Sequence, residues 1–101
     1  MTKVVNSKKY STETATLIGE TGYSYPGDLQ WWSEALYVKQ NGEFFVCGEG
    51  GAMSLYCQQV SANEWTGSSV ITPISEDEAR VWAEENIDYE TYVKFFGDVE
   101  E

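Results

Sequence analysis

Histidine is absent from the chain, and cysteine and proline occur only twice each. Without histidine, the chain lacks the commonest general base, the usual activator of serine and cysteine nucleophiles, and the commonest zinc ligand. Two cysteines cannot complete a four-ligand zinc site, and no calcium loop of the D-x-[DN]-x-[DN]-G type is present. We therefore expect no catalytic residue, no metal and no cofactor. Hydrolysis by paired carboxylates needs no histidine and stays a third hypothesis, although 101 residues leave little scaffold for its cleft.

Long apolar runs are also missing. None approaches the ~20 residues of a membrane-spanning helix, and the first lysines are not followed by the apolar stretch of a secretory signal. We therefore expect a cytoplasmic protein without membrane contact. Cys47 and Cys57 lack C-x-x-C spacing. Two reduced thiols are the default interpretation, and a disulfide between them is the alternative.

Basic residues are scarce, and the charge is unevenly distributed. Residues 75–101 carry ten acidic and two basic residues, a formal charge of −8, whereas residues 1–74 carry only −3. A chain this acidic is repelled by nucleic acid and attracted to basic proteins. We therefore expect no direct binding to nucleic acid and a basic protein as partner. Acidity that serves solubility alone is the competing interpretation.

The composition nevertheless predicts a folded protein, because 42% of the residues are hydrophobic and 15% are aromatic. We expect one domain over residues 1–101, mainly β in 1–74, with two acidic amphipathic helices in 75–97 and a tail in 98–101. Strands followed by helices predict an α+β fold. An antiparallel sheet of about four to five strands should carry the two C-terminal helices on one face.

Within 1–74, residues 2–5 are prone to form a strand, and residues 14–20 favour a strand over a helical turn. Residues 21–30, rich in glycine and proline, predict a loop. Residues 52–60 fit a helix or a strand, residues 61–70 fit a loop with a reversal, and residues 69–74 fit a final strand.

Asn41-Gly42 is a strong signal for a hairpin with a two-residue type I′ turn. That turn pairs Gln40 with Glu43 and places Val38 opposite Phe45. The segment GEGG at 48–51 then predicts a tight turn with positive φ. It is not interpreted as a phosphate loop, because it lacks the glycine spacing and the lysine of such loops.

Both helices carry boundary signals. Ser75 and Glu78 form the S-x-x-E capping box, Asp88 can cap the second helix, and Gly97 can end it. Helical spacing predicts that one helix buries Ala79, Trp82, Ala83 and Asn86, with Ile87 at the edge, and that the other buries Tyr89, Tyr92, Val93 and Phe96. We expect Trp82, Tyr92 and Phe96 to be substantially buried.

The exposed side of the first helix is the first candidate binding surface. It carries Asp77, Val81, Glu84 and Glu85, with Glu78 at its edge and Arg80 placed to pair with Asp77 or Glu84. Five acids in residues 76–85 span ~15 Å, or ~3 Å per charge, close to the ~3.4 Å of a DNA strand. Such a face could imitate a phosphate backbone, although any acid-rich solvated face has a similar density.

Trp31 and Trp32 are the second candidate. Neighbours on a strand point to opposite faces, so one should be core and the other outward. Which of them faces outward stays open. The outward one is either covered by a loop or is a contact anchor.

Three stretches together resemble a family of small acidic proteins of phages and mobile elements of Gram-positive bacteria. They are KKYSTETATLIGE at 8–20, NGEFFVCGEGGAMSLY at 41–56 and ITPISEDEARVWAEE at 71–85. Some members of that family resemble anti-CRISPR proteins that act on type II-A Cas9. The resemblance implies a non-enzymatic inhibitor that occupies the basic channel of Cas9 and blocks loading of guide RNA or DNA. Its motifs are fold patterns, so it assigns no site residue.

The expected function is therefore an acidic inhibitor of a basic nucleic-acid-handling protein, with Cas9 as the partner that the resemblance implies. The candidate partner-binding residues are Asp77, Glu78, Val81, Glu84, Glu85, Trp31 and Trp32. The alternative is a small soluble accessory domain of a mobile element that acts through homodimerisation or another protein contact.

Overall fold

The computed structural model describes residues 1–25, 27–52, 57–61 and 64–98, with side chains for all of these except 57–61 and 64–68. In this part of the chain, strands precede two helices. They are β1 (Thr2–Val5), β2 (Lys8–Ser11), β3 (Thr16–Tyr23), β4 (Trp32–Val38), β5 (Phe44–Gly50), β6 (Cys57–Ser61), β7 (Glu64–Ile74), α1 (Glu76–Asn86) and α2 (Tyr89–Phe96). The predicted α+β fold with two C-terminal helices is confirmed. Residues 26, 53–56, 62–63 and 99–101 of the predicted segments, and the side chain of Cys57, lie outside the described part of the chain.

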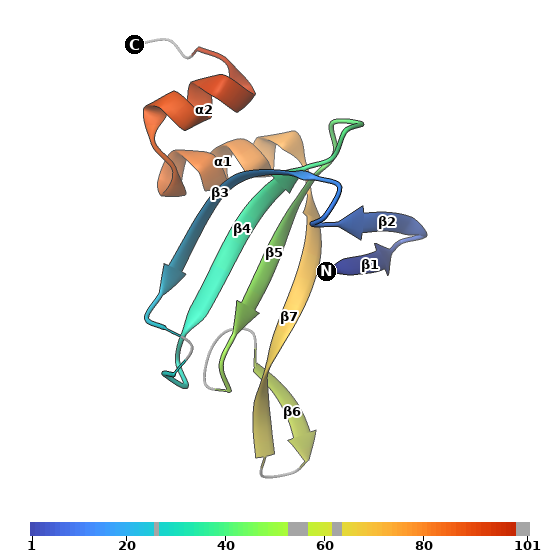
Figure 1. Cartoon of the computed structure of the whole chain (residues 1–101), viewed down its shortest axis with the longest axis vertical. Coiled ribbons are helices and arrows are strands. Elements are labelled where there is room, and N and C mark those ends of the chain that lie inside the picture. The colour runs from blue at the N-terminus through green and yellow to red at the C-terminus, as the bar shows by residue number, and fades with distance from the viewer. Residues whose placement is uncertain (26, 53–56, 62–63, 99–101) are drawn as a thin grey trace.

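The main sheet is antiparallel and has the order β3-β4-β5-β7-β6, while β1 and β2 form a separate pair. The long strand β7 pairs with two neighbouring strands. Its residues 68–74 pair with β5, and residues 64–67 pair with β6. The β6–β7 pair therefore extends the sheet away from the helices, which lie at the other end (Figure 1).

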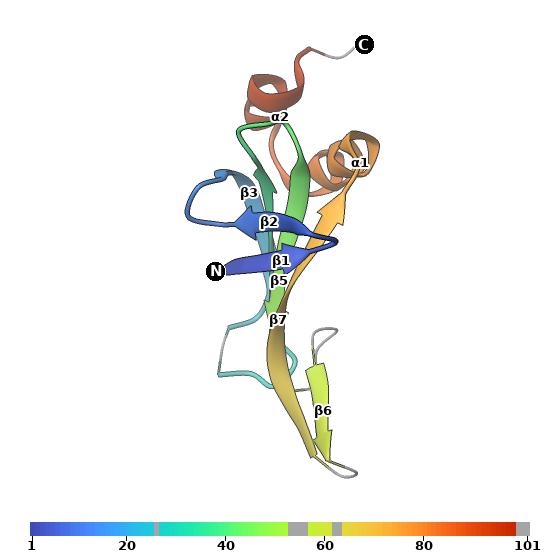
Figure 2. The same ribbon diagram turned by 90° about the vertical axis from the view of Figure 1, so that its right-hand side faces the viewer.

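Two separate clusters of buried side chains cover the two faces of this sheet. On one face, Ile18 and Leu36 pack with Ala79, Ala83 and Tyr92 of the helices. On the other face, Tyr10 of the β1–β2 pair packs with Phe45 and Ile71. We call these the helix face and the hairpin face. The β1–β2 pair lies beside β7 (Figure 2), where the Lys3 ammonium donates to the Ser69 carbonyl over 2.8 Å.

The connection between β4 and β5 differs from the predicted type I′ turn. The Lys39 N–H donates to the Glu43 carbonyl over 2.8 Å, which leaves a three-residue loop whose Gly42 has φ 89°. Asn41 is not among the described residues with positive φ, as a type I′ turn would require. The predicted register is therefore wrong by one residue, and Val38 lies opposite Phe44. This shift matters because it puts Phe44, rather than Phe45, on the helix face.

Three predicted loops are also partly strand. β3 extends to Tyr23, β5 runs through the predicted turn to Gly50, and β7 begins at Glu64. Gly48 and Gly50 have no positive φ, which is found only at Gly42 and Gly97 among the described glycines. The cause is pairing between segments distant in sequence, because Gly48 lies opposite Val70 and Gly50 opposite Ser68. Such pairing overrides the local turn preference of glycine.

The helix signals are confirmed. The Ser75 hydroxyl accepts from the Glu78 N–H, and the Glu78 carboxylate accepts from the Ser75 N–H, each over 3.1 Å. The Asp88 carboxylate accepts from the Thr91 N–H, and Gly97 ends α2.

Helix packing agrees with the prediction only in part. Ala79, Ala83 and Tyr92 are buried, whereas Trp82 and Phe96 are half-buried around that core. Phe96 stacks on Phe44 with 5.5 Å between ring centroids. Tyr89, predicted for the packed side of α2, is 64% exposed. The physical reason for this pattern is that the helices lie at one end of the sheet (Figure 1). Large side chains at the rim of their core are therefore partly open to solvent.

Candidate functional site

The packing of α1 determines which of its residues face outward. Ala79 and Ala83 have no exposed surface, so the opposite side of the helix faces solvent. Asp77, Val81 and Glu85 follow one another at intervals of four residues, which forms one row along an α-helix. Val81 is 53% exposed and stands between the two carboxylates.

This row borders a groove between α1 and the sheet, which we call the α1 groove. It has a volume of about 480 Å³ and is lined by Val46, Ile74, Asp77, Glu78, Val81, Trp82 and Glu85. The sheet contributes only apolar side chains to the lining, and the helix contributes three carboxylates with Val81 and Trp82. Four predicted site residues, Asp77, Glu78, Val81 and Glu85, therefore line one concave surface. Glu84 is exposed on the same helix but does not line it.

Arg80 does not neutralise this row. Its guanidinium lies 3.5 Å from the Glu76 carboxylate and 5.2 Å from the Phe96 ring. A hydrogen bond to Tyr92 and the Glu76 carboxylate raise the pKa of Arg80 above its ordinary value. The predicted pairing with Asp77 or Glu84 is wrong, because the long side chain reaches the aromatic residues of α2 instead. Within the described residues, no ion pair involves Asp77, Glu84 or Glu85.

The wall of the groove is fixed by a contact that the sequence did not identify. The Trp82 indole Nε1 donates to the Glu34 carboxylate over 3.0 Å, which anchors the ring against β4. The side-chain amide of Asn86 donates to the Trp82 carbonyl over 2.9 Å. No local motif marks Glu34 as a partner of Trp82, because the two residues are 48 positions apart.

Basic residues collect around the hairpin face. Four of the six lysine and arginine residues of the chain lie there. They are Lys3 of β1, Lys8 and Lys9 of β2, and Lys39, which follows β4 and lies over the Tyr10 ring. The Glu43 carboxylate lies 2.8 Å from the Lys8 ammonium and 3.3 Å from that of Lys39. Hydrogen bonds from Lys8, Asn41 and Lys39 lower the pKa of Glu43 to about 2. The molecule therefore has an acidic α1 and a hairpin region where positive charge is partly compensated.

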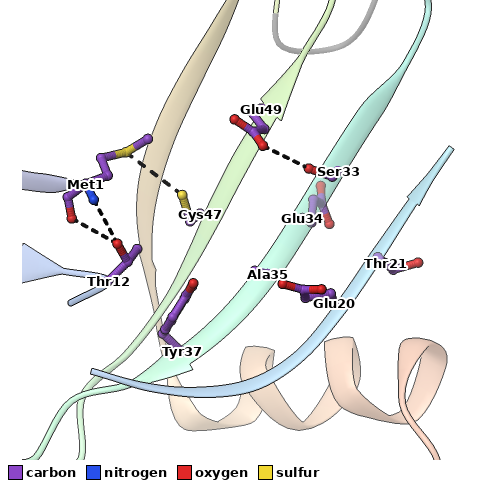
Figure 3. Close-up of a pocket in the computed structure, with 10 residues that line it drawn as sticks. All are labelled: Met1, Thr12, Glu20, Thr21, Ser33, Glu34, Ala35, Tyr37, Cys47 and Glu49. Atoms are coloured by element: carbon purple, nitrogen blue, oxygen red, sulfur yellow. Dashed lines mark hydrogen bonds between the residues drawn. The ribbon is translucent and has the colours of Figure 1, made fainter. Parts of the chain in front are cut away.

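A second concave surface lies on the hairpin face and has a volume of about 400 Å³ (Figure 3). It contains Cys47, whose thiol is free and lies 3.9 Å from the Met1 sulfur. Burial, followed by the charge of Glu49, raises the pKa of Cys47 above its ordinary value. A thiol with a raised pKa is a poor nucleophile at neutral pH. Within the described ranges, no group of three or more cysteines and carboxylates could hold a metal ion.

Trp31 and Trp32 lie apart from the α1 groove. They stand where β4 begins, at the end of the sheet away from the helices (Figure 1). Both are half-buried, so the expected division into one core and one outward ring is wrong. Trp31 precedes the strand, where its N–H donates to Asp28 and its carbonyl accepts from Gly51. The strand rule for neighbouring side chains therefore does not apply to this pair.

No protein-family model, no curated protein and no solved structure matches this chain. Neither helix in the described residues is long and apolar enough to cross a membrane.

Proposed function

We propose that this chain is a non-enzymatic binding protein that presents α1 to a basic groove of a nucleic-acid-handling protein. The observation that carries the proposal is the row of Asp77, Val81 and Glu85, in which an exposed apolar side chain stands between two carboxylates. No described lysine or arginine pairs with these carboxylates. A positively charged groove that binds phosphates attracts the carboxylates of this row, and the row contains no cation that the groove would repel.

Attraction and retention come from different parts of this surface. The exposed carboxylates accelerate the encounter with a positively charged partner, because charges of opposite sign steer diffusion. Val81 and the apolar lining of the α1 groove then lose contact with water, which slows dissociation. A surface with charge alone would bind any cation weakly, so the apolar part supplies the selectivity.

Cas9 is the partner that the family resemblance suggests. Its guide–target heteroduplex lies in a positively charged channel that recognises the nucleic-acid backbone. A chain of 101 residues bound there would block guide RNA or target DNA, and it would act in the cytoplasm of a bacterial host cell. This mechanism needs no reaction, cofactor or metal.

A second candidate is an accessory domain that forms a homodimer through the β3–β4 connection. The observation that favours it is the exposure of Tyr25 and Leu29, at 67% and 61%, close in sequence to Trp31. Exposed apolar side chains gathered in one place mark contact surfaces.

The test measures binding of the purified chain to Cas9 with and without bound guide RNA, at low and high salt. We expect binding to one form, competition with guide RNA or target DNA, and weaker binding as salt rises. Absence of binding to both forms would overturn the choice of Cas9. Light scattering that shows a stable dimer, lost in the variant Leu29→Ser, would favour the second candidate.

A further inference from the structure

We infer that the α1 groove accepts an arginine side chain of the partner; this rests on the proposed function and specifies the chemistry of the contact. The groove offers two kinds of surface at once. Val46, Ile74 and Val81 give an apolar lining, and Asp77 and Glu85 stand at either end of the helical row. Its volume of about 480 Å³ lies within the ~300–1,000 Å³ of typical ligand pockets.

The spacing of the row suits a long side chain with one charged end. Each step of four residues advances ~6 Å along an α-helix. A side chain lying across Val81 therefore has a carboxylate at about that distance on both sides. Only lysine and arginine combine an apolar stem with a cationic head, and both cover apolar surface with the stem.

Trp82 favours arginine over lysine. Its indole N–H is already bound to Glu34, which holds the ring as a wall of the groove. A guanidinium is planar and weakly hydrated, so it stacks on an indole ring and donates to a carboxylate at the same time. An ammonium is strongly hydrated and loses more on approaching this apolar lining.

The chain itself contains such an arrangement on another side of α1. The guanidinium of Arg80 lies 5.2 Å from the Phe96 ring centroid and 3.5 Å from the Glu76 carboxylate. An arginine of the partner would be held in the α1 groove by Trp82 together with Asp77 or Glu85.

The experiment titrates the full 101-residue chain with a blocked glycine-serine peptide that carries three spaced arginines. Matched peptides carry lysine or neutral citrulline at the same positions. NMR spectra of the ¹⁵N-labelled chain report the Trp82 indole N–H and the Val81 amide. We expect the arginine peptide to shift both signals and to bind ~5-fold more tightly than the lysine peptide. The citrulline peptide should not bind.

Two double variants distinguish the effect of the groove carboxylates on binding from the effect of net charge. Asp77→Asn with Glu85→Gln should weaken the arginine peptide ~5-fold or more, because both carboxylates of the row are lost. Glu13→Gln with Glu90→Gln removes the same charge outside the groove and should change binding less than ~2-fold. Equal binding of the lysine peptide, equal losses in both variants, or shifts centred on Trp31 and Trp32 would each overturn the inference.

The outcome is distinguishable from failure of the proposed function. If the chain binds the arginine peptide more tightly than the lysine peptide but does not bind Cas9, the arginine contact in the α1 groove is supported and Cas9 is excluded as the partner. Cas9 binding that is indifferent to the Asp77 and Glu85 variant would keep the function and overturn the arginine contact.

Discussion

The indole Nε1 of Trp82 donates to a carboxylate oxygen of Glu34 over 3.0 Å and thereby ties the middle of α1 to β4. The Trp82 ring packs against the core cluster that contains Ala79 and Ala83, two fully buried residues of α1. Their small size lets α1 approach the sheet closely, and the Trp82 ring then reaches past them to the strand. The bond therefore positions both the helix and the wall of the α1 groove.

Trp82→Phe should lower the free energy of unfolding by about 1–3 kcal/mol, because it removes a partly buried hydrogen bond to a charged group. Glu34→Gln should cost less than about 1 kcal/mol, since its amide oxygen can still accept from the indole. Denaturant unfolding of both variants checks the order. A larger loss in Glu34→Gln than in Trp82→Phe would contradict the assigned role of this bond.

The contrast between local and distant signals explains what the sequence could predict. The caps at Ser75 and Asp88 depend on residues three positions apart, so their motifs were sufficient to place both helices. The register of β4 and β5 depends on a three-residue loop that the Asn41-Gly42 pair does not distinguish from a two-residue one. The strand character of Gly48 and Gly50 depends on β7, which lies about twenty residues further on.

The same distinction applies to the candidate site. Helical periodicity placed Asp77, Val81 and Glu85 on one side of a helix, and they lie together. It could not show that Val46 and Ile74 complete a groove, because that requires the sheet. Nor could it separate Trp31 and Trp32 from this surface, since only the course of β4 puts them at the end of that strand that lies away from the helices (Figure 1).

Gly51→Ala should destabilise the fold by about 1–3 kcal/mol, because an added methyl group overpacks its surroundings. A Cβ at Gly51 would lie 2.5 Å from the Leu29 carbonyl oxygen and 2.9 Å from Trp31 Cδ1. Gly27→Ala is the matched control, since its Cβ would meet only the exposed and movable ring of Tyr25. Thermal unfolding of both variants checks this. Equal losses of stability in the two variants would show that the backbone near Leu29 can move to accommodate a methyl group at Gly51.

Glu43→Gln should make stability less dependent on pH between pH 4.5 and 2. The folded protein holds the pKa of Glu43 at about 2, against 4.5 for an ordinary glutamate, so it binds a proton less readily than the unfolded chain. The contribution of Glu43 is therefore fully present above pH 4.5 and is lost as the pH falls toward 2.

The measurement is the melting temperature of the wild type and of Glu43→Gln from pH 7 to pH 2. The wild type should melt higher at pH 7, and the two curves should converge near pH 2. The lowered pKa values of Asp28 and Asp88 affect both proteins and cancel in the comparison. A gap that stays constant over this range would contradict the role of the contacts with Lys8 and Lys39.

Reversing the charge of the groove should weaken binding to Cas9, or to another basic partner, more than reversing it elsewhere. Asp77→Lys with Glu85→Lys places two cations at the ends of the Val81 row, and we expect at least a ~10-fold loss of affinity. Glu13→Lys with Glu90→Lys changes the net charge equally outside the groove and should lose less affinity. Neither pair should alter stability by more than about 1 kcal/mol, since all four side chains are exposed. Equal losses of affinity would mean that net charge alone drives association.

Val81→Glu separates attraction from packing, because it adds a negative charge while removing the apolar side chain at the centre of the row. If charge alone holds the complex, association should be unchanged or faster and dissociation unchanged. If Val81 is buried against the apolar stem of the partner's arginine, the new carboxylate loses its water beside methylene groups while the guanidinium stays with Asp77 or Glu85, and dissociation should accelerate. We expect the second result, with Val81→Ala giving a smaller effect in the same direction.

Surface plasmon resonance at two salt concentrations resolves the rates, since screening lengths fall from ~8 Å at physiological ionic strength to ~3 Å at 1 M. Unchanged dissociation of Val81→Glu would place the contact elsewhere on the molecule.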